Sequence, residues 1–346
     1  MKRGTAAWRD AGHGGLEGRG TWRTGWTGAA LEERGSMDGE TGLPHVVFVV
    51  GPTAVGKSAF AVQLALETGG EVVSADSMQV YRGLDLGTAK PSTEERRGVP
   101  HHMIDVANPR EGYSAGAYLK GAQAAISGIL GRGCQPVVCG GSGLYVHALL
   151  YEGMDLSGEG LDGGLRERLR LEAEEKGGAY MFEKLLAADP EAAARIHPNN
   201  VKRVIRALER ASGAAESGGL RDFSGTFEAR PRYDARIVRL VADRDALYAR
   251  IEKRAEAFFE AGLVREVRGL LDSGVPADST AMQGIGYKEV VAMLGGEYGE
   301  AEALRLVKQN SRRYAKRQET WFKRYTGAEL VVENTTSGNF MQNLRY

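Results

Sequence analysis

The stretch GPTAVGKS at residues 51–58 places the strongest constraint on how this chain can fold. It matches the phosphate-binding pattern G-x-x-x-x-G-K-[ST]. A continuous apolar, β-branched run at 45–50 precedes it, as in a buried parallel strand, and an amphipathic segment reaching about Thr68 follows it. Such a strand–loop–helix unit turns backbone N–H groups and a helix N-terminus toward an anion. The stretch therefore predicts a parallel sheet with a phosphate site where its first strand ends.

Further strand and helix patterns extend this unit into an α/β fold. Four more apolar runs resemble buried strands; they cover residues 71–76, 135–141, 236–243 and 329–334. Strands that alternate with helical segments predict a P-loop parallel sheet with helices on both faces. Between 155 and 230 the strand signals stop, and helical spacing between glycine-rich breaks predicts an all-helical insertion domain. The expected organisation is a disordered leader at 1–44, a catalytic core at 45–154 and 231–334, the insertion at 155–230 and a tail at 335–346.

Composition excludes several functional classes. Lys+Arg and Asp+Glu both number 45, so the chain is not a uniformly basic nucleic-acid binder, although local basic patches are allowed. No apolar run approaches the length of a membrane span. Cys134 and Cys139 fit neither a disulfide framework nor a zinc pattern, so we expect a cytoplasmic protein. The leader lacks a signal-peptide core and is interpreted as disordered, or as an extension upstream of a natural start at Met37.

Each group of the 51–58 loop has an expected task. Glycines let the backbone wrap around phosphate oxygens, the lysine supplies a point charge, and the serine hydroxyl can reach Mg²⁺. The candidate phosphate-binding residues are Gly51, Pro52, Thr53, Ala54, Val55, Gly56, Lys57 and Ser58. Kinases, NTPases and prenyl transferases could all use such a loop, so the loop alone does not fix the chemistry.

Asp76 is the first discriminating residue downstream. It closes the strand run at 71–76, so it should lie at the carboxyl edge of the sheet, where ligands bind in open α/β proteins. Its carboxylate could hold Mg²⁺, take a proton from an acceptor substrate, or simply cap the next helix. His101 and His102 invite a metal interpretation, but no third ligand is spaced nearby and we expect no metal there.

Six motifs, taken in order, resemble the tRNA dimethylallyltransferase (tRNA isopentenyltransferase) family over about residues 45–325. They read GPTAVGKS, ADSMQVYRGLDLGTAKP, HHMID, CGGSGLY, HPNNVKRVIRALE and AMQGIGYKEV. The resemblance implies transfer of a dimethylallyl group from dimethylallyl diphosphate to N6 of the adenine just 3′ of the anticodon, in tRNAs that read codons beginning with U. It further implies a monomeric enzyme whose partner is the tRNA anticodon stem-loop.

The resemblance also assigns catalytic roles. Asp76 becomes the general base for the adenine amine, which is a poor nucleophile because its lone pair is delocalised into the ring; a base that takes its proton as the C–N bond forms would help. Arg254, in the run RIEKR at 250–254, matches a family arginine that contacts the diphosphate, and Arg250 is the weaker choice. Together with Lys57 and Mg²⁺ on Ser58, this arginine would stabilise the departing pyrophosphate.

Candidate RNA contacts come from the same motifs and from two basic runs. Gln79 is expected to read a base edge, and Ser142 stands where the family commonly has threonine. Asn200 replaces a usual aspartate and can still cap the following helix. The basic runs cover 201–210, with its apolar residues facing inward, and 305–324, with eight basic residues against Glu319; a solvated basic face is the alternative. The candidate tRNA-binding residues are Asp76, Ser77, Met78, Gln79, Ser142, Arg166, Lys202, Arg203, Arg206, Gln283, Gly286, Tyr287, Lys288, Lys316, Arg317 and Trp321.

Three other functions share part of this pattern. A small-molecule kinase would place ATP on the loop and use Asp76 toward a hydroxyl, but it has no need of the basic run at 305–324. An adenylate dimethylallyltransferase performs the same chemistry on a free nucleotide, without the RNA-contacting insertion and C-terminal helices. A non-enzymatic RNA-binding module would have no reason to keep Lys57, Ser58 and Asp76 together.

Overall fold

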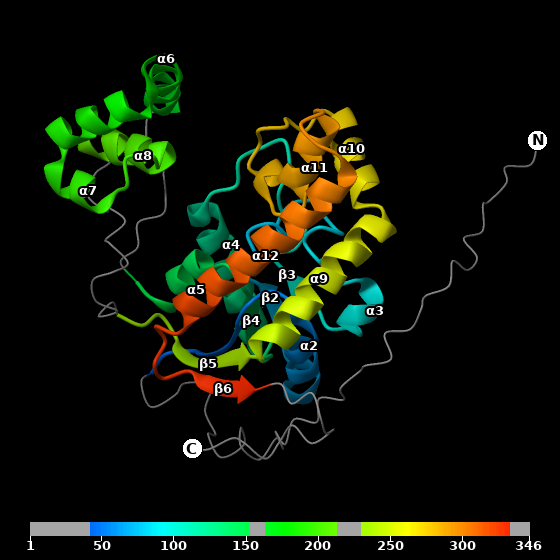
Figure 1. Ribbon diagram of the computed structural model, residues 1–346. Coiled ribbons are helices and arrows are strands. Elements are labelled where there is room, and N and C mark those ends of the chain that lie inside the picture. The colour runs from blue at the N-terminus through cyan, green and yellow to red at the C-terminus, as the bar shows by residue number, and fades with distance from the viewer. Residues whose placement is uncertain (1–41, 153–162, 213–229, 333–346) are drawn as a thin grey trace, which may run out of the picture.

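A computed structural model describes residues 42–152, 163–212 and 230–332 of the chain. Its described residues form one sheet of six strands in the order β3-β2-β4-β1-β5-β6, and every neighbouring pair is parallel (Figure 1). The strands are β1 (His45–Val50), β2 (Glu71–Ser74), β3 (His101–His102), β4 (Pro136–Gly140), β5 (Asp234–Val241) and β6 (Glu329–Val332). The predicted parallel α/β fold is thereby confirmed, and each of the five predicted runs overlaps a strand.

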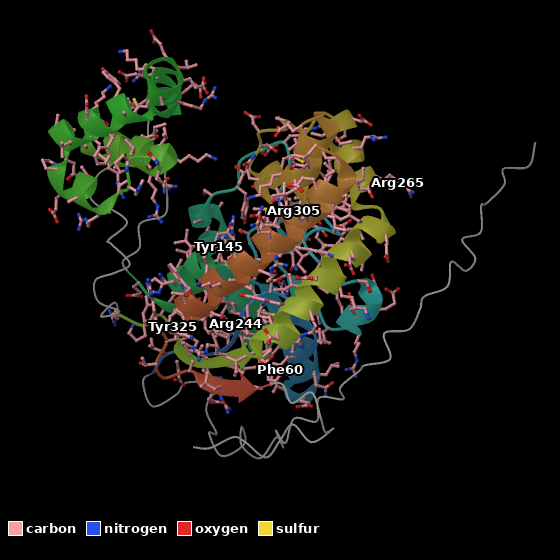
Figure 2. The ribbon with its side chains drawn as sticks, viewed as in Figure 1. Phe60, Tyr145, Arg244, Arg265, Arg305 and Tyr325 are labelled. Carbon is pink, nitrogen blue, oxygen red and sulfur yellow. The ribbon has the colours of Figure 1, made fainter. Side chains whose placement is uncertain are left out.

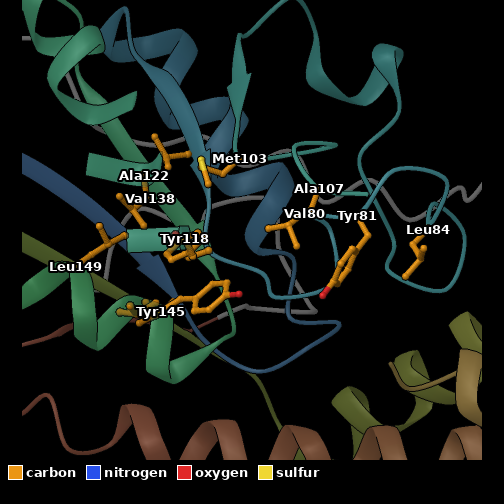
Figure 3. Close-up of a cluster of buried hydrophobic side chains, with 14 of the residues drawn as sticks. Val80, Tyr81, Leu84, Met103, Ala107, Tyr118, Ala122, Val138, Tyr145 and Leu149 are labelled. Atoms are coloured by element: carbon orange, nitrogen blue, oxygen red, sulfur yellow. The ribbon is translucent and has the colours of Figure 1, made fainter. Parts of the chain in front are cut away.

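Helices cover both faces of this sheet. The side chains of the inner strand β1 alternate between the two faces and enter two separate apolar cores. Phe48 of β1 points into the core packed by α4 (Ala115–Gly131) and α5 (Gly143–Leu150), whereas Val49 points into the core packed by α2 (Lys57–Thr68) and α9 (Arg244–Ala261). Figure 3 shows the first core, in which Tyr118 of α4 stacks on Tyr145 of α5 with ring centroids 3.7 Å apart. The second core contains Phe60 of α2 (Figure 2).

The edge strand β3 escaped the sequence prediction because it is only two residues long. It pairs with Val72 and Val73 of β2, and its His102 ring contacts the Glu71 carboxylate at 2.6 Å. Arg132 donates two hydrogen bonds to the same carboxylate, and these bonds hold the pKa of Glu71 down at about 2 despite its burial. His102 thus belongs to a hydrogen-bond network that ties β3 and the end of α4 to β2.

The C-terminal helices form a layer that begins at β5. α9 ends at Ala261, and the next residue, Gly262, has a φ of 105° and turns the chain into α10 (Leu263–Asp272). The layer continues through the 3₁₀ turn η1 (Ala281–Gln283), α11 (Tyr287–Leu294) and the long α12 (Glu300–Phe322). The short α3 (Thr93–Arg96), between β2 and β3, is not part of this layer. α12 is fastened alongside α9 by ion pairs from Lys308 and Arg312 to acidic residues of α9.

Three helices in the region of the expected insertion pack on one another. They are α6 (Gly163–Ala188), α7 (Pro190–Arg195) and α8 (Val201–Ala211), grouped together in Figure 1. Their own apolar core contains Met181, Leu185 and Leu208, among others. The Asn200 side chain caps α8 by accepting the Arg203 N–H at 3.3 Å, as predicted. Among the described residues, no helix combines the length and apolarity needed to cross a membrane.

Candidate active site

The phosphate loop has the backbone conformation that its sequence predicts. Gly51 and Gly56 have φ values of 148° and 93°, and Ala54 adopts the left-handed region at 64°. A side chain at Gly51 would come within 2.6 Å of the Leu240 carbonyl oxygen of β5, so the glycine also permits close strand packing. α2 then begins at Lys57, with the Ser58 hydroxyl exposed in its first turn. This arrangement exposes a helix N-terminus to an anion at the carboxyl edge of the sheet.

Two cations converge on this loop. Lys57 donates a hydrogen bond from Nζ to the Pro52 carbonyl at 2.7 Å, and burial lowers its pKa to about 8. The Arg254 guanidinium, from α9, donates to the Thr53 hydroxyl and stacks over the Phe258 ring at 5.6 Å. Burial also lowers the pKa of Arg254. The structure thus brings the predicted arginine to the predicted loop, although 201 residues separate Arg254 from Thr53.

Asp76 lies two residues beyond the end of β2 and organises the turn that follows the strand. Its Oδ1 atom accepts the N–H groups of Met78 and Gln79 at 2.8 and 3.3 Å. The next residue, Ser77, donates its N–H to the Ser142 hydroxyl at 2.9 Å, so the turn is also tied to the start of α5. Asp76 therefore combines the capping role with a position at the same sheet edge as the phosphate loop.

Gln79 is buried, with its side-chain amide already in use. Its Oε1 accepts a hydrogen bond from Ser74, and its Nε2 donates to the carbonyl oxygens of Thr88 and Ala89. In this conformation the amide holds the loop that follows Asp76, and a base edge could reach it only if those hydrogen bonds opened. Met78 and Ser77 are more open, each half-buried beside it.

One side of α12 presses on the segment between β4 and α5, a contact that the sequence did not predict. Gln318 donates to the Gly141 carbonyl at 3.0 Å, and the Tyr314 hydroxyl reaches the same oxygen at 3.4 Å. A side chain at Gly143 would lie 2.6 Å from the Trp321 indole. The glycines of CGGSGLY therefore leave room for α12 to pack closely. Their spacing is the only feature of the sequence that could have predicted this close approach.

The basic run of α12 divides into two halves. Arg305, Lys308 and Arg312 are each paired with a glutamate of α9 or α12. Arg305 lies near the start of the helix, and Tyr325 lies just beyond its other end (Figure 2). The second half lines a hollow of about 490 Å³, formed by Arg313, Lys316, Arg317, Thr320, Trp321 and Arg324. An open, positively charged hollow beside an aromatic ring suits a nucleic acid better than a small neutral metabolite.

The glycine-rich QGIGYK segment connects η1 to α11. Gln283 and Lys288 are exposed there, and the Lys288 ammonium lies 3.7 Å from the Glu289 carboxylate. Tyr287 is completely buried, with its ring against Gly87 and its hydroxyl donating to Glu266. Gly286 is buried as well, so Tyr287 and Gly286 support the surface rather than form it.

Helix α8 presents the first basic run to solvent. Lys202, Arg203 and Arg206 are exposed, while Val204 and Ile205 point into the helical core, which confirms the predicted inward-facing side. The side chain of Arg166 lies outside the described residues, as do the leader up to residue 41 and the tail from 333. Among the described residues, no three His, Cys, Asp or Glu side chains cluster in a way that could hold a metal ion.

Comparisons with known proteins identify relatives over the same region. The family model for IPP transferase matches residues 79–325, and the model for isopentenyl transferase matches residues 44–113. The tRNA dimethylallyltransferase of Alkaliphilus oremlandii is 46% identical over 281 residues, covering 81% of this chain and 89% of that protein. The enzyme of the same name from Bacillus subtilis is 45% identical over 280 residues, covering 80% and 87%.

Solved structures agree with this relationship. The tRNA isopentenylpyrophosphate transferase of Bacillus halodurans superposes with a TM-score of 0.61 at 41% identity, covering 83% of this chain and 89% of that one. A eukaryotic dimethylallyltransferase, described as acting on tRNA, gives a TM-score of 0.69 at 27% identity, covering 83% of this chain and 73% of that one. The chain belongs to the tRNA dimethylallyltransferase family.

Proposed function

We propose that this chain transfers a dimethylallyl group from dimethylallyl diphosphate to N6 of the adenine 3′-adjacent to the anticodon, in tRNAs that read codons beginning with U. One observation carries the proposal. The phosphate loop with its two cations and the Asp76 turn lie at one edge of the sheet, and α12 links both to a basic hollow. A donor site, a base and a polyanion surface within one unit are what RNA prenylation requires.

The diphosphate end is built from the loop and from α9. Loop amides, the Lys57 ammonium and the Arg254 guanidinium would neutralise charge as it develops on the departing pyrophosphate. The exposed Ser58 hydroxyl suits Mg²⁺, which binds through few protein oxygens and through substrate phosphates. Such an ion, held by Ser58 and the diphosphate, would supply further stabilisation of the leaving group.

The acceptor end is built around Asp76. In the proposed reaction, the bond between the allylic carbon and the diphosphate oxygen breaks as the adenine N6–carbon bond forms. The N6 proton passes to the Asp76 carboxylate, and pyrophosphate leaves with the electron pair of the broken bond. Oδ1 of Asp76 already holds the turn, which leaves Oδ2 to receive that proton. The adenine must first leave the anticodon stack, since the edge of the sheet cannot enter a stacked loop.

RNA recognition would use the exposed basic surfaces. The second half of α12, with Lys316, Arg317 and Trp321, is proposed to receive the anticodon loop, and Gln283 and Lys288 would extend that surface. The helical insertion at 155–230 would bind the phosphates of the anticodon stem through the exposed cations of α8. Gln79 and Tyr287 would then act indirectly, by fixing the loops that carry the exposed contacts.

One assay with three acceptors tests the proposal. The protein is incubated with labelled dimethylallyl diphosphate and Mg²⁺, and with an anticodon stem-loop, AMP or no acceptor. Label transfer to a stem-loop with adenine next to the anticodon, and not to one with guanine there, is expected. Transfer to AMP alone would indicate an adenylate dimethylallyltransferase, and ATP turnover without prenyl transfer would indicate a kinase; either result rejects the proposal.

A further inference from the structure

The Gln318 side chain is buried between two parts of the candidate site. Only 5% of the residue is exposed, and both the oxygen and the nitrogen of its amide are hydrogen-bonded. Oε1 accepts the Thr53 N–H of the phosphate loop at 2.8 Å, and Nε2 donates to the Gly141 carbonyl after β4 at 3.0 Å. These partners lie 265 and 177 residues away from Gln318 in sequence, so the contact exists only in the folded chain.

Both partners are themselves connected to groups proposed to take part in the chemistry. The Thr53 hydroxyl accepts a hydrogen bond from the Arg254 guanidinium. The phosphate loop is therefore hydrogen-bonded to α9 through Arg254 and to α12 through Gln318. Gly141 is followed by Ser142, whose hydroxyl accepts the N–H of Ser77, the neighbour of Asp76. An almost continuous chain of hydrogen bonds therefore runs from the phosphate loop through Gln318 to the turn that carries the base.

The residue type suits this position closely. A glutamine offers one acceptor and one donor at the end of a single side chain, whereas glutamate lacks the donor and lysine lacks the acceptor. A carboxylate here would also add negative charge beside a diphosphate site. The fit is tight, since a side chain at residue 141 would come within 2.2 Å of the Gln318 Nε2 atom. Gln318 can therefore occupy this position only because residue 141 is a glycine.

We propose that Gln318 is a positioning residue for prenyl transfer: its amide fixes the phosphate loop at a set separation from the Asp76 turn. This inference rests on the proposed function, because it assigns the loop to the leaving group and Asp76 to the base. Gln318 touches neither substrate and acts through Thr53 and Gly141. Without it both halves of the site remain folded, but their separation is no longer fixed, and small misplacements of reacting groups are costly in rate.

The test compares Gln318→Met, which keeps the length and loses both hydrogen bonds, with Gln309→Met, the same change at a half-exposed position of α12. Gln318→Met should lower kcat about a hundredfold with both substrates saturating. Its Kd values for inorganic pyrophosphate and for the stem-loop should each stay within about threefold of the parent protein. Amide exchange should become faster at Thr53. Gln309→Met should match the parent in every measurement.

Gln318→Asn guards against a folding failure of the first variant, because it keeps the amide and is too short to reach both partners. It should show an intermediate kcat and faster exchange at Thr53. Parent-like kcat in either variant, or a fall in kcat that is matched by loss of stem-loop binding, would overturn the positioning role. Failure of the parent protein to prenylate any stem-loop would instead overturn the proposed function, while exchange at Thr53 would still report whether Gln318 holds the loop.

Discussion

Diphosphate binding should drive a proton onto Lys57. In the free protein the pKa of this lysine falls from 10.5 to about 8, chiefly through burial; Arg254 adds to the lowering, while Cys139 and Asp76 oppose it. A diphosphate beside the ammonium would return the pKa to its ordinary range or above, since an adjacent anion favours the charged form. A return of the pKa to its ordinary value corresponds to a coupling of about 3 kcal/mol between protonation and binding.

The number of protons taken up follows from the pKa of the free protein. At pH 7 about a tenth of Lys57 is neutral, and at pH 8.5 about three-quarters is neutral. Binding should therefore consume about 0.1 proton at pH 7 and about 0.8 proton at pH 8.5. The affinity for pyrophosphate should fall as the pH rises above 8, because the ammonium must then be recharged before it can pair with the ligand.

Titration calorimetry in two buffers with different ionisation enthalpies measures this uptake directly. Lys57→Arg is the matched control, because its guanidinium stays charged and its binding reports only the ionisation of pyrophosphate itself. The difference in proton uptake between the two proteins at pH 8.5 should be about 0.8. Equal uptake in both proteins would show that Lys57 is already charged in the free loop and that burial does not lower its pKa to about 8.

Three further predictions follow from single contacts. Asp76→Asn keeps an oxygen for the Met78 and Gln79 N–H groups, so turnover should fall about 10²- to 10⁴-fold while the Kd for the stem-loop holds within about twofold; a large loss of RNA affinity would make Asp76 chiefly a recognition residue. Gly143→Ala places a methyl group 2.6 Å from the Trp321 indole, which should cost about 1–3 kcal/mol in unfolding free energy and weaken stem-loop binding but not pyrophosphate binding, whereas Gly128→Ala, inside α4 with its nearest contact at 3.4 Å, should raise the unfolding free energy by about 0.5–1 kcal/mol and leave both affinities unchanged. Glu71→Gln should lose about 2 kcal/mol in denaturant unfolding at pH 7; because folding lowers the pKa of Glu71 from 4.5 to about 2, its stabilisation is complete above pH 4.5, so a difference from the parent that did not shrink below that pH would contradict the assignment.

The features that local sequence could predict are those set by neighbours along the chain. The HVVFVV run, the glycines of the loop and the end of α2 at Thr68 depend on β propensity, backbone freedom and a left-handed glycine at position 69. Asp76 could be placed because a residue that closes a parallel strand lies at a known edge of the sheet. The outward and inward sides of α8 followed from its helical period.

What the sequence did not reveal depends on pairing between distant elements. The run QGIGYK has the composition of a flexible surface loop, yet Tyr287 is buried because Gly87 leaves room for its ring. Gln79 has the polarity of a base reader, but its amide is engaged by carbonyls of Thr88 and Ala89. Neither outcome has a local signal. Each depends on which surface the folded chain brings opposite the residue. Only the placement of Arg254 at the phosphate loop, 201 residues away from Thr53, was predicted between distant segments, and it came from the family resemblance.

Zero net charge is compatible with a polyanionic partner because pairing within the fold is uneven. On α12 the first three cations of the run are neutralised by glutamates, while Arg313, Lys316 and Arg317 line the hollow. Exposed cations gather again on α8, whose apolar side is buried. A formal balance of 45 positive and 45 negative residues therefore conceals local fields of one sign. The salt dependence of RNA binding should accordingly reflect the few cations that contact phosphates, and the total number of basic residues in the chain has no bearing on it.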